Sequence, residues 1–372
     1  MVALLYIIPV AACLVLHFGF RYEGDWTAYA WIFGCGEATI VLLQIAFFRS
    51  IAYFDEYLGS TVKSIHYEAP WTEVITVYET RTDSKGRTYT RARRQYIYHP
   101  EKHYFHTTTG VRHATNSAYF NEVRDRWNVA KHPDRWTGLN IVGGVRSGFH
   151  YNFSDLPYAS QCDIAYWIPI TELHKYKNKV RCSNSIFKFE KISREEAEEK
   201  GLIDYPKISG YDAPAILSKD FTVPEKADDM FRKFNAGIAP GSQMRLYILL
   251  FDGNKEIGVS ELQRAYWQGG NKNEFVICIG IDGKGSVKWA RAFSWADEQQ
   301  IEVEVAQEIM KWETLDWQRL FRWLQGNISR WKRKEFKDFN YINVSLPLKH
   351  FIWILILSLI ENSLAVWFFL SR

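Results

Sequence analysis

The chain has 372 residues, a formal net charge of +4 and 47% hydrophobic residues. This length is enough for one or two domains with buried cores. So small a net charge argues against nucleic acid as a partner, because nucleic-acid-binding domains are usually strongly basic. Cys13 and Cys35 lie in apolar runs, which leaves Cys162, Cys182 and Cys278, too few and too widely spaced for a disulfide framework. The cysteines therefore favour a reducing compartment.

The apolar residues are concentrated at the two ends of the chain. Residues 2–20, 29–48 and 351–370 form apolar runs of about 20 residues, each long enough to cross about 30 Å of hydrocarbon as a helix. A signal peptide is the alternative for the first run, but no basic residue precedes it and a second run follows at once. The sequence therefore predicts a transmembrane hairpin (1–50) and a C-terminal transmembrane helix (347–372).

Basic residues near the ends of these runs set the expected orientation. The loop after the first run contains Arg21, and the C-terminal tail contains Arg372. The other side is richer in basic residues, namely Arg49, Lys63, Arg330, Lys332, Arg333, Lys334, Lys337 and Lys349. We therefore expect a multi-pass protein of the plasma (inner) membrane, with the bulk of the chain in the cytoplasm and in contact with anionic headgroups. Translocation of the body is the alternative, since long domains can cross regardless of charge.

Polar residues interrupt two of the apolar runs. Glu37 lies near the middle of the second run, and Glu361 and Asn362 lie near the middle of the third. An acidic side chain at that depth usually faces protein or water, and small residues around Glu37 permit close helix contact. A proton or ion site is one interpretation, and protonated carboxyls that hold helices together are the other. We favour assembly, as a homo-oligomer or with another membrane protein, because three helices alone make a poor conduit.

The segment before the last run, residues 312–346, is predicted to hold an amphipathic helix. Apolar residues recur there at helical spacing, and basic residues occupy much of the remaining surface. This pattern is typical of a helix on an anionic membrane surface, and a helix packed on a domain core is the alternative. The residues expected at the membrane surface are Trp317, Trp323, Trp331, Arg330, Lys332, Arg333 and Lys334.

Residues 51–192 are predicted to form a β-rich subdomain. Alternating side chains on both sides of a turn at 83–86 indicate a hairpin, and a helix is expected over 117–127. We expect the glycine-rich residues 135–158 to form a loop and residues 179–190 a strand. Four histidines could indicate a metal site, but strand alternation points them to different faces and no cysteine or acidic partner completes the set. They are His99, His103, His106 and His113. No metal or cofactor is predicted.

Residues 193–311 are predicted to form a smaller α/β sheet subdomain, so the expected fold class is α+β. Continuous apolar strands and intervening helices in this region indicate a sheet covered on both faces. A polar loop at 269–274 joins a helix to a strand, a place where α/β proteins often bind ligands. Any tight turn uses similar residues, however. The candidate ligand-binding residues are Asn271, Lys272, Asn273 and Glu274.

The element order in residues 243–312 resembles the TPM domain family. The resemblance rests on Tyr266-Trp267-Gln268-Gly269-Gly270-Asn271-Lys272-Asn273-Glu274, between an aromatic helix end and an apolar strand. That family combines a central sheet with helices and is often tethered to a membrane. The resemblance therefore implies a scaffold or interaction role more than a definite reaction. The chain departs from the family after the strand pair, where Arg291-Ala292-Phe293-Ser294-Trp295 replaces the usual glycine-rich segment.

Familiar catalytic patterns do not occur in the sequence, including nucleotide-binding glycine loops, zinc-protease and serine-hydrolase motifs and Cys-x-x-Cys pairs. Residues 143–148 are glycine-rich and could hold a phosphate, but a plain loop is expected because no helix clearly follows. We therefore expect a membrane-tethered, non-enzymatic assembly or interaction protein. The alternatives are a membrane-bound hydrolase or phosphatase that uses the 269–274 loop, and an ion- or proton-conducting oligomer that uses Glu37 and Glu361.

Overall fold

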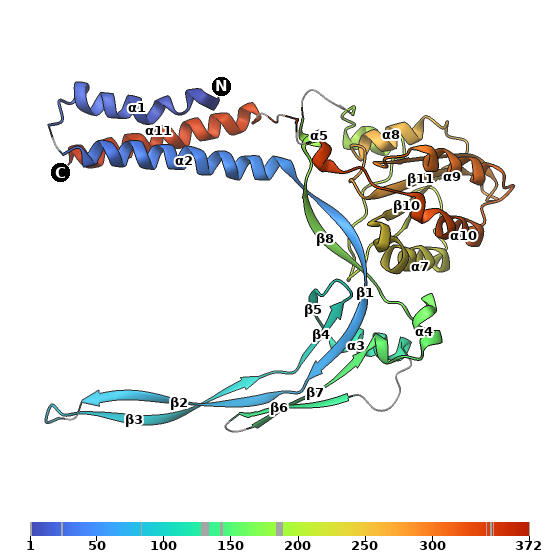
Figure 1. Ribbon diagram of the computed structural model, residues 1–372, viewed down its shortest axis with the longest axis horizontal. Helices are drawn as coiled ribbons and strands as arrows, with labels where there is room; N and C mark the ends of the chain where they lie inside the picture. Colours follow the sequence, from blue (N-terminus) through green and yellow to red (C-terminus); the bar gives the residue numbers. More distant parts are fainter. Residues whose placement is uncertain are drawn as a thin grey trace. The chain divides into compact units, whose positions relative to one another are not determined.

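The computed structural model (Figure 1) describes residues 2–23, 25–82, 84–127, 134–141, 144–183, 189–339, 341, 342, 344 and 346–371. The chain forms two compact units. The first comprises Met1–Glu56, Lys175–Glu190 and Glu335–Arg372, and the second comprises Tyr57–His174 and Lys191–Lys334. The mixed α+β fold is confirmed. The two sheets that the sequence assigns to separate subdomains fall within the second unit.

The first unit is built from apolar helices. Helices α2 (Thr27–Ala52) and α11 (Leu348–Leu370) are long and apolar enough to cross a membrane, by length and composition. The first apolar run is not one long α-helix, because α1 (Ile7–Leu14) continues as the π-helical η2 (Val15–Gly19). Pro9 lacks a backbone N–H and is tolerated near a helix start, which accords with a beginning at Ile7. The shorter elements are η1 (Val2–Leu4), α5 (Lys179–Cys182) and η8 (Phe336–Phe339).

Helices α1, α2 and α11 pack on one another through small and apolar side chains. Their buried residues form two clusters, Leu16 with Ala28, Ile32 and Val366, and Leu5 with Ile40 and Ile354. A Cβ added at Gly36 of α2 would lie 2.7 Å from Cγ of Pro9 and 3.0 Å from Oδ1 of Asn362. The glycine therefore allows the three helices to approach closely.

A long central strand organises the larger sheet of the second unit. β1 (Tyr53–Glu68) pairs antiparallel with β4 (Lys102–Thr107) and β7 (Gly144–Asn152), and it also pairs with β8 (Pro169–Lys177). β5 (Arg112–Thr115) and β6 (Asp134–Ile141) complete the order β5-β4-β1-β7-β6. Helix α3 (Ser117–Arg126), capped by Asn116, buries Phe120 and Val123 in the same core. The short helices here are η3 (Phe153–Asp155), α4 (Tyr158–Cys162) and η4 (Ile164–Tyr166).

Two sequence predictions for this region are wrong. Residues 135–158 contain β6 and β7 instead of a loop. β7 pairs with β1 and β6 pairs with β7, and this pairing overrides the weak strand preference of glycine. Residues 179–182 form α5 instead of a strand, since the Asn178 side chain accepts a hydrogen bond from the Arg181 N–H at 2.9 Å and starts a helix. Gly143 of the predicted phosphate loop and residues 184–188 lie outside the described residues.

The predicted hairpin is confirmed as a separate two-stranded sheet (Figure 1). β2 (Trp71–Thr82) and β3 (Thr88–His99) pair antiparallel over their full lengths. Most β3 side chains are exposed, including Tyr89, Tyr96 and Tyr98.

The smaller sheet of the second unit has helices on both faces. It consists of β9 (Ile216–Ser218), β10 (Arg245–Asp252), β11 (Glu274–Ile281) and β12 (Val287–Ser294). Their order is β12-β11-β10-β9, and β12 alone among these four is antiparallel to its neighbour. The continuous apolar strands predicted from the sequence are confirmed, because β10 and β11 are buried along nearly their whole length.

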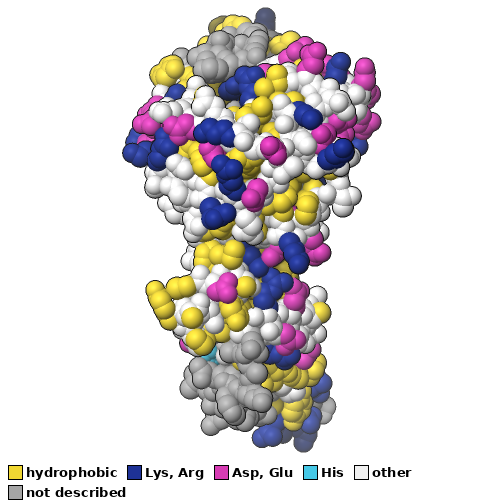
Figure 2. Space-filling view, turned by 90° about the vertical axis from the view of Figure 1, so that its right-hand side faces the viewer, with side chains coloured by type: hydrophobic (Ala, Val, Ile, Leu, Met, Phe, Trp, Pro, Cys, Tyr) yellow, Lys and Arg dark blue, Asp and Glu magenta, His cyan; other side chains and the backbone are white. Residues whose placement is uncertain are grey.

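One face of this smaller sheet packs against α7 (Glu225–Lys233), α9 (Gln300–Met310) and α10 (Trp317–Asn327). The other face packs against α6 (Arg194–Glu199) and α8 (Val259–Tyr266). The connecting helical turns are η5 (Phe234–Ile238), η6 (Ala239–Ser242) and η7 (Ile328–Arg330). Figure 2 views the side on which α9 and α10 lie, and it shows basic and acidic side chains interspersed.

Candidate functional site

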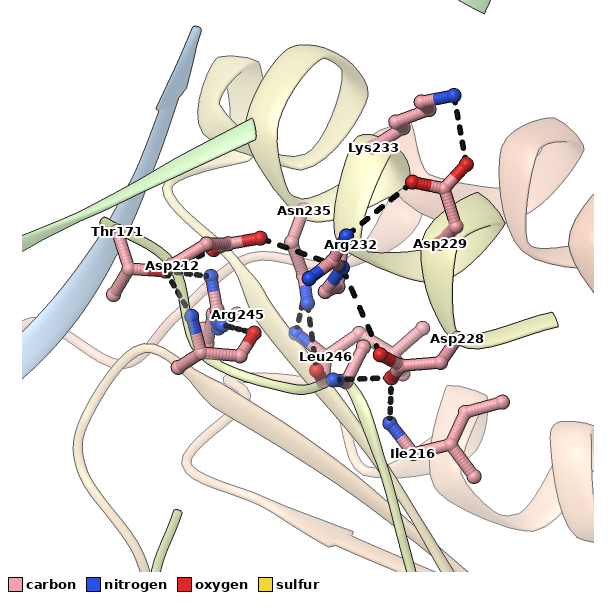
Figure 3. Close-up of polar contacts among 12 residues, drawn as sticks. Thr171, Asp212, Ile216, Asp228, Asp229, Arg232, Lys233, Asn235, Arg245 and Leu246 are labelled. Atoms are coloured by element: carbon pink, nitrogen blue, oxygen red, sulfur yellow. Dashed lines mark hydrogen bonds and ion pairs between the residues drawn. The ribbon is translucent and has the colours of Figure 1, made fainter. Parts of the chain in front are cut away.

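A buried polar network, the polar seam, joins the larger sheet to the smaller one (Figure 3). Arg245, at the start of β10, is 1% exposed. Its Nη1 donates to Oγ1 of Thr171 on β8 at 3.0 Å, and its Nη2 donates to the carbonyl of Ala213 at 2.9 Å. Thr171 donates to Oδ1 of Asp212 at 2.5 Å. The polar seam comprises Thr171, Asp212, Asp228, Asp229, Arg232, Lys233, Asn235 and Arg245.

The carboxylates of the polar seam are paired as well. Asp228 accepts from the backbone N–H groups of Ala215 at 2.8 Å and Ile216 at 2.9 Å. Nε of Arg232 lies 3.6 Å from Oδ2 of both Asp228 and Asp212. Burial raises the pKa of Asp212, although Arg245 and the hydrogen bond from Thr171 oppose this. These groups face one another, so the polar seam is a structural joint between the two sheets.

The predicted ligand loop is a packed junction. Asn271, Asn273 and Glu274 are 4%, 1% and 1% exposed, and Lys272 is half-buried. Glu274 accepts from the backbone N–H and from the side-chain amide of Asn271, each at 2.8 Å, and Tyr205 donates to the same carboxylate. Asn273 donates to a backbone carbonyl of β1 at 2.8 Å. The loop's amide and carboxylate groups therefore bind the protein's own residues, and this placement does not support a ligand or phosphoester site.

The polar residues of the apolar helices lie close to the contacts between those helices. Thr39 of α2 donates to Oε1 of Glu361 on α11 at 2.9 Å. Asn362 is 3% exposed and donates to the carbonyl of Ser358 at 2.8 Å, one turn earlier in α11. Glu37 is half-buried and lies two residues before Thr39. The structure therefore brings Glu361 and Asn362 to the contact with α2, at Thr39 and Gly36 respectively.

The helix expected at the membrane surface instead belongs to the core of the second unit. It is shorter than predicted, and its apolar stripe packs against the sheet with Leu320, Phe321 and Leu324. Trp331 lies beyond the helix, is 2% exposed and donates from its indole to Oγ of Ser294 at 3.0 Å. Trp317 and Trp323 pack against the same core. The structure therefore corrects the membrane-surface assignment of Trp331, because the protein's own core covers it, whereas contact of the half-buried Trp317 and Trp323 with the membrane stays a prediction.

The basic residues of this segment follow the helix and lie beside β12. Arg330 forms a two-point ion pair with Glu304 of α9, at 2.7 and 3.0 Å. Directly after β12, the backbone of residues 295–297 pairs with that of residues 332–334, so Lys332, Arg333 and Lys334 are tied down through their main chain. Contact of these basic side chains with lipid remains a prediction.

The four histidines singled out in the sequence are not brought together. His99 bonds to Glu73 at 2.9 Å, while His103 and His113 contact separate aromatic rings. His106 instead pairs with His66 on β1, and the distance from its Nδ1 to Nε2 of His66 is 3.1 Å. Burial, together with His106, His150 and Arg112, lowers the pKa of His66 to about 4. Among the described residues, no group of three or more His, Cys, Asp or Glu side chains could hold a metal ion.

A groove of about 530 Å³ lies along β12, and we call it the β12 groove. Its floor is residues 290–293 of β12, and its walls come from helices on opposite faces of the sheet. On the α8 side Glu261 forms an ion pair with Arg291 of the floor. The α9 wall is mixed, with apolar Val303 and Met310, respectively 54% and 47% exposed, beside Glu302. The β12 groove therefore combines apolar surface with charged groups of both signs.

Glu302 is the perturbed acid of the β12 groove. Burial raises its pKa to about 7, although Arg264 and a hydrogen bond from the Ser294 backbone N–H oppose the rise. Its Oε1 is buried, and no described group hydrogen-bonds to it. An apolar groove with charged groups and a perturbed acid is where a ligand is most expected. The β12 groove is therefore the candidate functional site.

The sequence analysis missed the β12 groove because its parts are far apart in the chain. Arg264, Arg291 and Glu302 lie on a helix, a strand and another helix, and each looks like an ordinary surface charge in its own segment. A comparison with protein-family models, curated proteins and solved structures finds no match to this chain.

Proposed function

We propose that this chain is a membrane-tethered, non-enzymatic protein that assembles with itself or with other proteins. The observation that carries the proposal is the outer surface of α1, α2 and α11. Large apolar side chains there are exposed, among them Leu42 at 65%, Trp367 at 66% and Ile360 at 52%. Covering one such side chain is worth about 1.5–3 kcal/mol. A surface of this kind supports insertion of all three helices into lipid.

The contacts inside this group of helices favour assembly over conduction. The bond from Thr39 to Glu361 occupies one carboxyl oxygen, and Gly36 brings α1 and α11 against α2. Such contacts between small and polar residues are those that hold membrane helices together. A proton- or ion-conducting oligomer that uses Glu37 and Glu361 is the second candidate, supported by the buried Oε2 of Glu361, to which no described group hydrogen-bonds.

The remaining parts of the proposal rest on the sequence. The excess of basic residues on the body side of the second and third apolar runs supports a plasma (inner) membrane protein whose bulk lies in the cytoplasm, next to anionic headgroups. The resemblance of residues 243–312 to the TPM family supports an interaction role. A hydrolase or phosphatase that uses the 269–274 loop is not favoured, since Asn271 and Glu274 bind each other and Asn273 binds a carbonyl of β1.

Extraction from membranes and particle mass together test this proposal. We expect the protein to stay in the membrane pellet in alkaline carbonate, to dissolve in mild detergent, and to have a mass above one chain by light scattering. Gly36→Leu should reduce the assembled fraction because it forces α1 and α11 away from α2. Gly34→Leu is the matched control, since nothing lies within 4 Å of a Cβ there. Release by carbonate would contradict the membrane tether, and a single-chain mass for wild type would contradict assembly of the chain with itself.

Conduction is tested separately by proton or ion flux in vesicles that contain the purified protein. Flux that disappears in the variant with both Glu37→Gln and Glu361→Gln would favour the conducting oligomer. If the wild-type protein gives no more flux than empty vesicles, the conducting oligomer is ruled out.

A further inference from the structure

We propose that the β12 groove binds an extended peptide segment of a partner protein, which adds a strand to the open edge of β12 and sets a basic side chain against Glu302. The inference deepens the proposed interaction role by naming the kind of partner. It does not depend on the membrane helices, because the β12 groove lies wholly in the second unit.

The first argument is the open edge of β12. β12 is the last strand in the order β12-β11-β10-β9, so one of its edges has no partner among the described strands. The chain itself pairs at the start of this edge, where the Val287 N–H donates to the Glu313 carbonyl at 3.2 Å. Just beyond the other end, the Lys334 N–H donates to the Trp295 carbonyl at 2.6 Å. Extended backbone is therefore already accommodated beside both ends of β12.

The second argument is that the strand's main chain faces the β12 groove. Four consecutive residues, 290–293, line it, although successive side chains of a strand point to opposite faces. A groove lined in this way runs along the strand's edge. The Ser294 N–H lies close enough to the Glu302 carboxylate to lower its pKa, so Glu302 reaches this edge from α9. Because alternate N–H groups of a strand point the same way, those of Ala290 and Ala292 are expected to face an added strand.

The third argument is size. One wall of the β12 groove consists of α9 and the residues next to its two ends, and it runs from Gln299 to Lys311. At a rise of about 1.5 Å per residue this wall is about 18 Å long. An extended peptide rises about 3.4 Å per residue, so about five of its residues fit alongside. Peptide addition to a sheet edge next to a helix is a known mode of recognition, in which main-chain bonds give affinity and alternate side chains give specificity.

The fourth argument is charge complementarity at Glu302. Its Oε1 is buried in the wall, and no described group hydrogen-bonds to it. Arg291, which faces α8, is already paired with Glu261. A lysine or arginine of the peptide would supply Glu302 with a donor and a second positive charge, and Val303 and Met310 would cover the aliphatic part of that side chain.

The test is selection of random nine-residue peptides displayed on phage against the full-length protein in lipid nanodiscs. Enriched peptides are then made with a fluorescent label and titrated by anisotropy. We expect enrichment of a basic residue flanked by β-branched residues. We also expect N-methylation of alternate backbone nitrogens to weaken binding at least about tenfold, because it removes the main-chain bonds of an added strand.

Variants of the α9 wall locate the binding. Val303→Trp fills the β12 groove and should weaken binding at least about tenfold, whereas Val111→Trp, at a valine that is 43% exposed outside the groove, should leave it unchanged. Glu302→Gln should remove the preference for the basic peptide over its alanine version. If Val303→Trp does not fold, as judged by circular dichroism, Glu302→Lys replaces it and should repel the basic peptide.

Any one of three results would overturn the inference. These are no enrichment of peptides, equal binding by the wall variants and wild type, and full binding of the N-methylated peptide. Any of these would leave the membrane-tethered proposal standing, since extraction and particle mass test that proposal without reference to the β12 groove.

Discussion

The polar seam and the β12 groove differ in how far the protein's own residues partner their buried charged groups. In the polar seam, both Nη atoms of Arg245 donate hydrogen bonds, to Thr171 and Ala213, and Asp212 lies close by, although Nε of Arg245 and Oδ2 of Asp212 have no hydrogen-bond partner among the described residues. In the β12 groove, Glu302 is partly buried, and its Oε1 has no hydrogen-bond donor among the described residues. A buried charge without a full set of partners costs stability. The hydrogen bonds of the polar seam join the protein's two sheets, whereas Glu302 of the β12 groove has a buried oxygen that a ligand's donor could bind.

The largest expected effect comes from breaking the polar seam. Arg245→Met should lower the free energy of unfolding by about 3–5 kcal/mol, because it leaves the buried Asp212 without its main cation. Urea denaturation of the detergent-solubilised protein, followed by tryptophan fluorescence, measures it. Adding Asp212→Asn to this variant should restore part of the loss, since the unpaired charge is then removed. A loss below about 1 kcal/mol for Arg245→Met would show that the seam is not a structural joint.

A substitution in the β12 groove should raise the free energy of unfolding instead of lowering it. We expect Glu302→Gln to stabilise the protein above pH 7. Burial raises the Glu302 pKa from 4.5 to about 7, so wild type loses stability as pH rises from about 4.5 to about 7, when the folded carboxyl ionises. The full shift corresponds to about 3–4 kcal/mol, and partial exposure reduces the expected gain at pH 8 to about 2 kcal/mol. Urea unfolding should give wild type and Glu302→Gln equal stabilities at pH 4.5, and a higher stability for Glu302→Gln at pH 8. Equal stabilities at pH 8 would mean that ionised Glu302 is not destabilising.

The smallest effect on stability is expected from breaking an exposed ion pair, which serves as a contrast to the buried charged groups of the polar seam. Arg330 and Glu304 form a two-point contact on the surface of α9, but solvent screens such pairs. Arg330→Ala should leave the thermal midpoint unchanged within error. A marked fall in the midpoint would show that this contact anchors residues 332–334 beside β12.

The parts of the fold that follow local patterns could be predicted from the sequence. The β2–β3 hairpin follows from alternating side chains around a turn, and β10 and β11 follow from continuous apolar runs. Strands β6 and β7 were missed because β7 pairs with β1, which is remote in sequence, and β6 joins the sheet only through β7. The periodicity of α10 was recognised, but one apolar stripe suits a membrane surface or a core equally well, and only packing distinguishes them.

The sites depended still more on tertiary contacts. Asn271 and Glu274 were singled out as candidate ligand-binding residues of a polar loop, yet they bond to each other and to Tyr205, which lies 66 residues before Asn271. Glu302 carries no signal in its own segment, because its pKa is raised by burial. Glu37, Glu361 and Asn362 could be found because polar residues are rare in apolar runs, and the structure places Glu361 against Thr39.

Labelling of Cys162 in oriented membrane vesicles tests the membrane-tethered account most directly. Cys162 is exposed in the second unit, Cys278 is buried, Cys182 is half-buried, and Cys13 and Cys35 lie in the apolar helices. A membrane-impermeant maleimide should label the sedimented protein in inside-out vesicles but not in right-side-out vesicles, and Cys162→Ser should abolish the label. Labelling in right-side-out vesicles, or protein that does not sediment with the vesicles, would contradict the account.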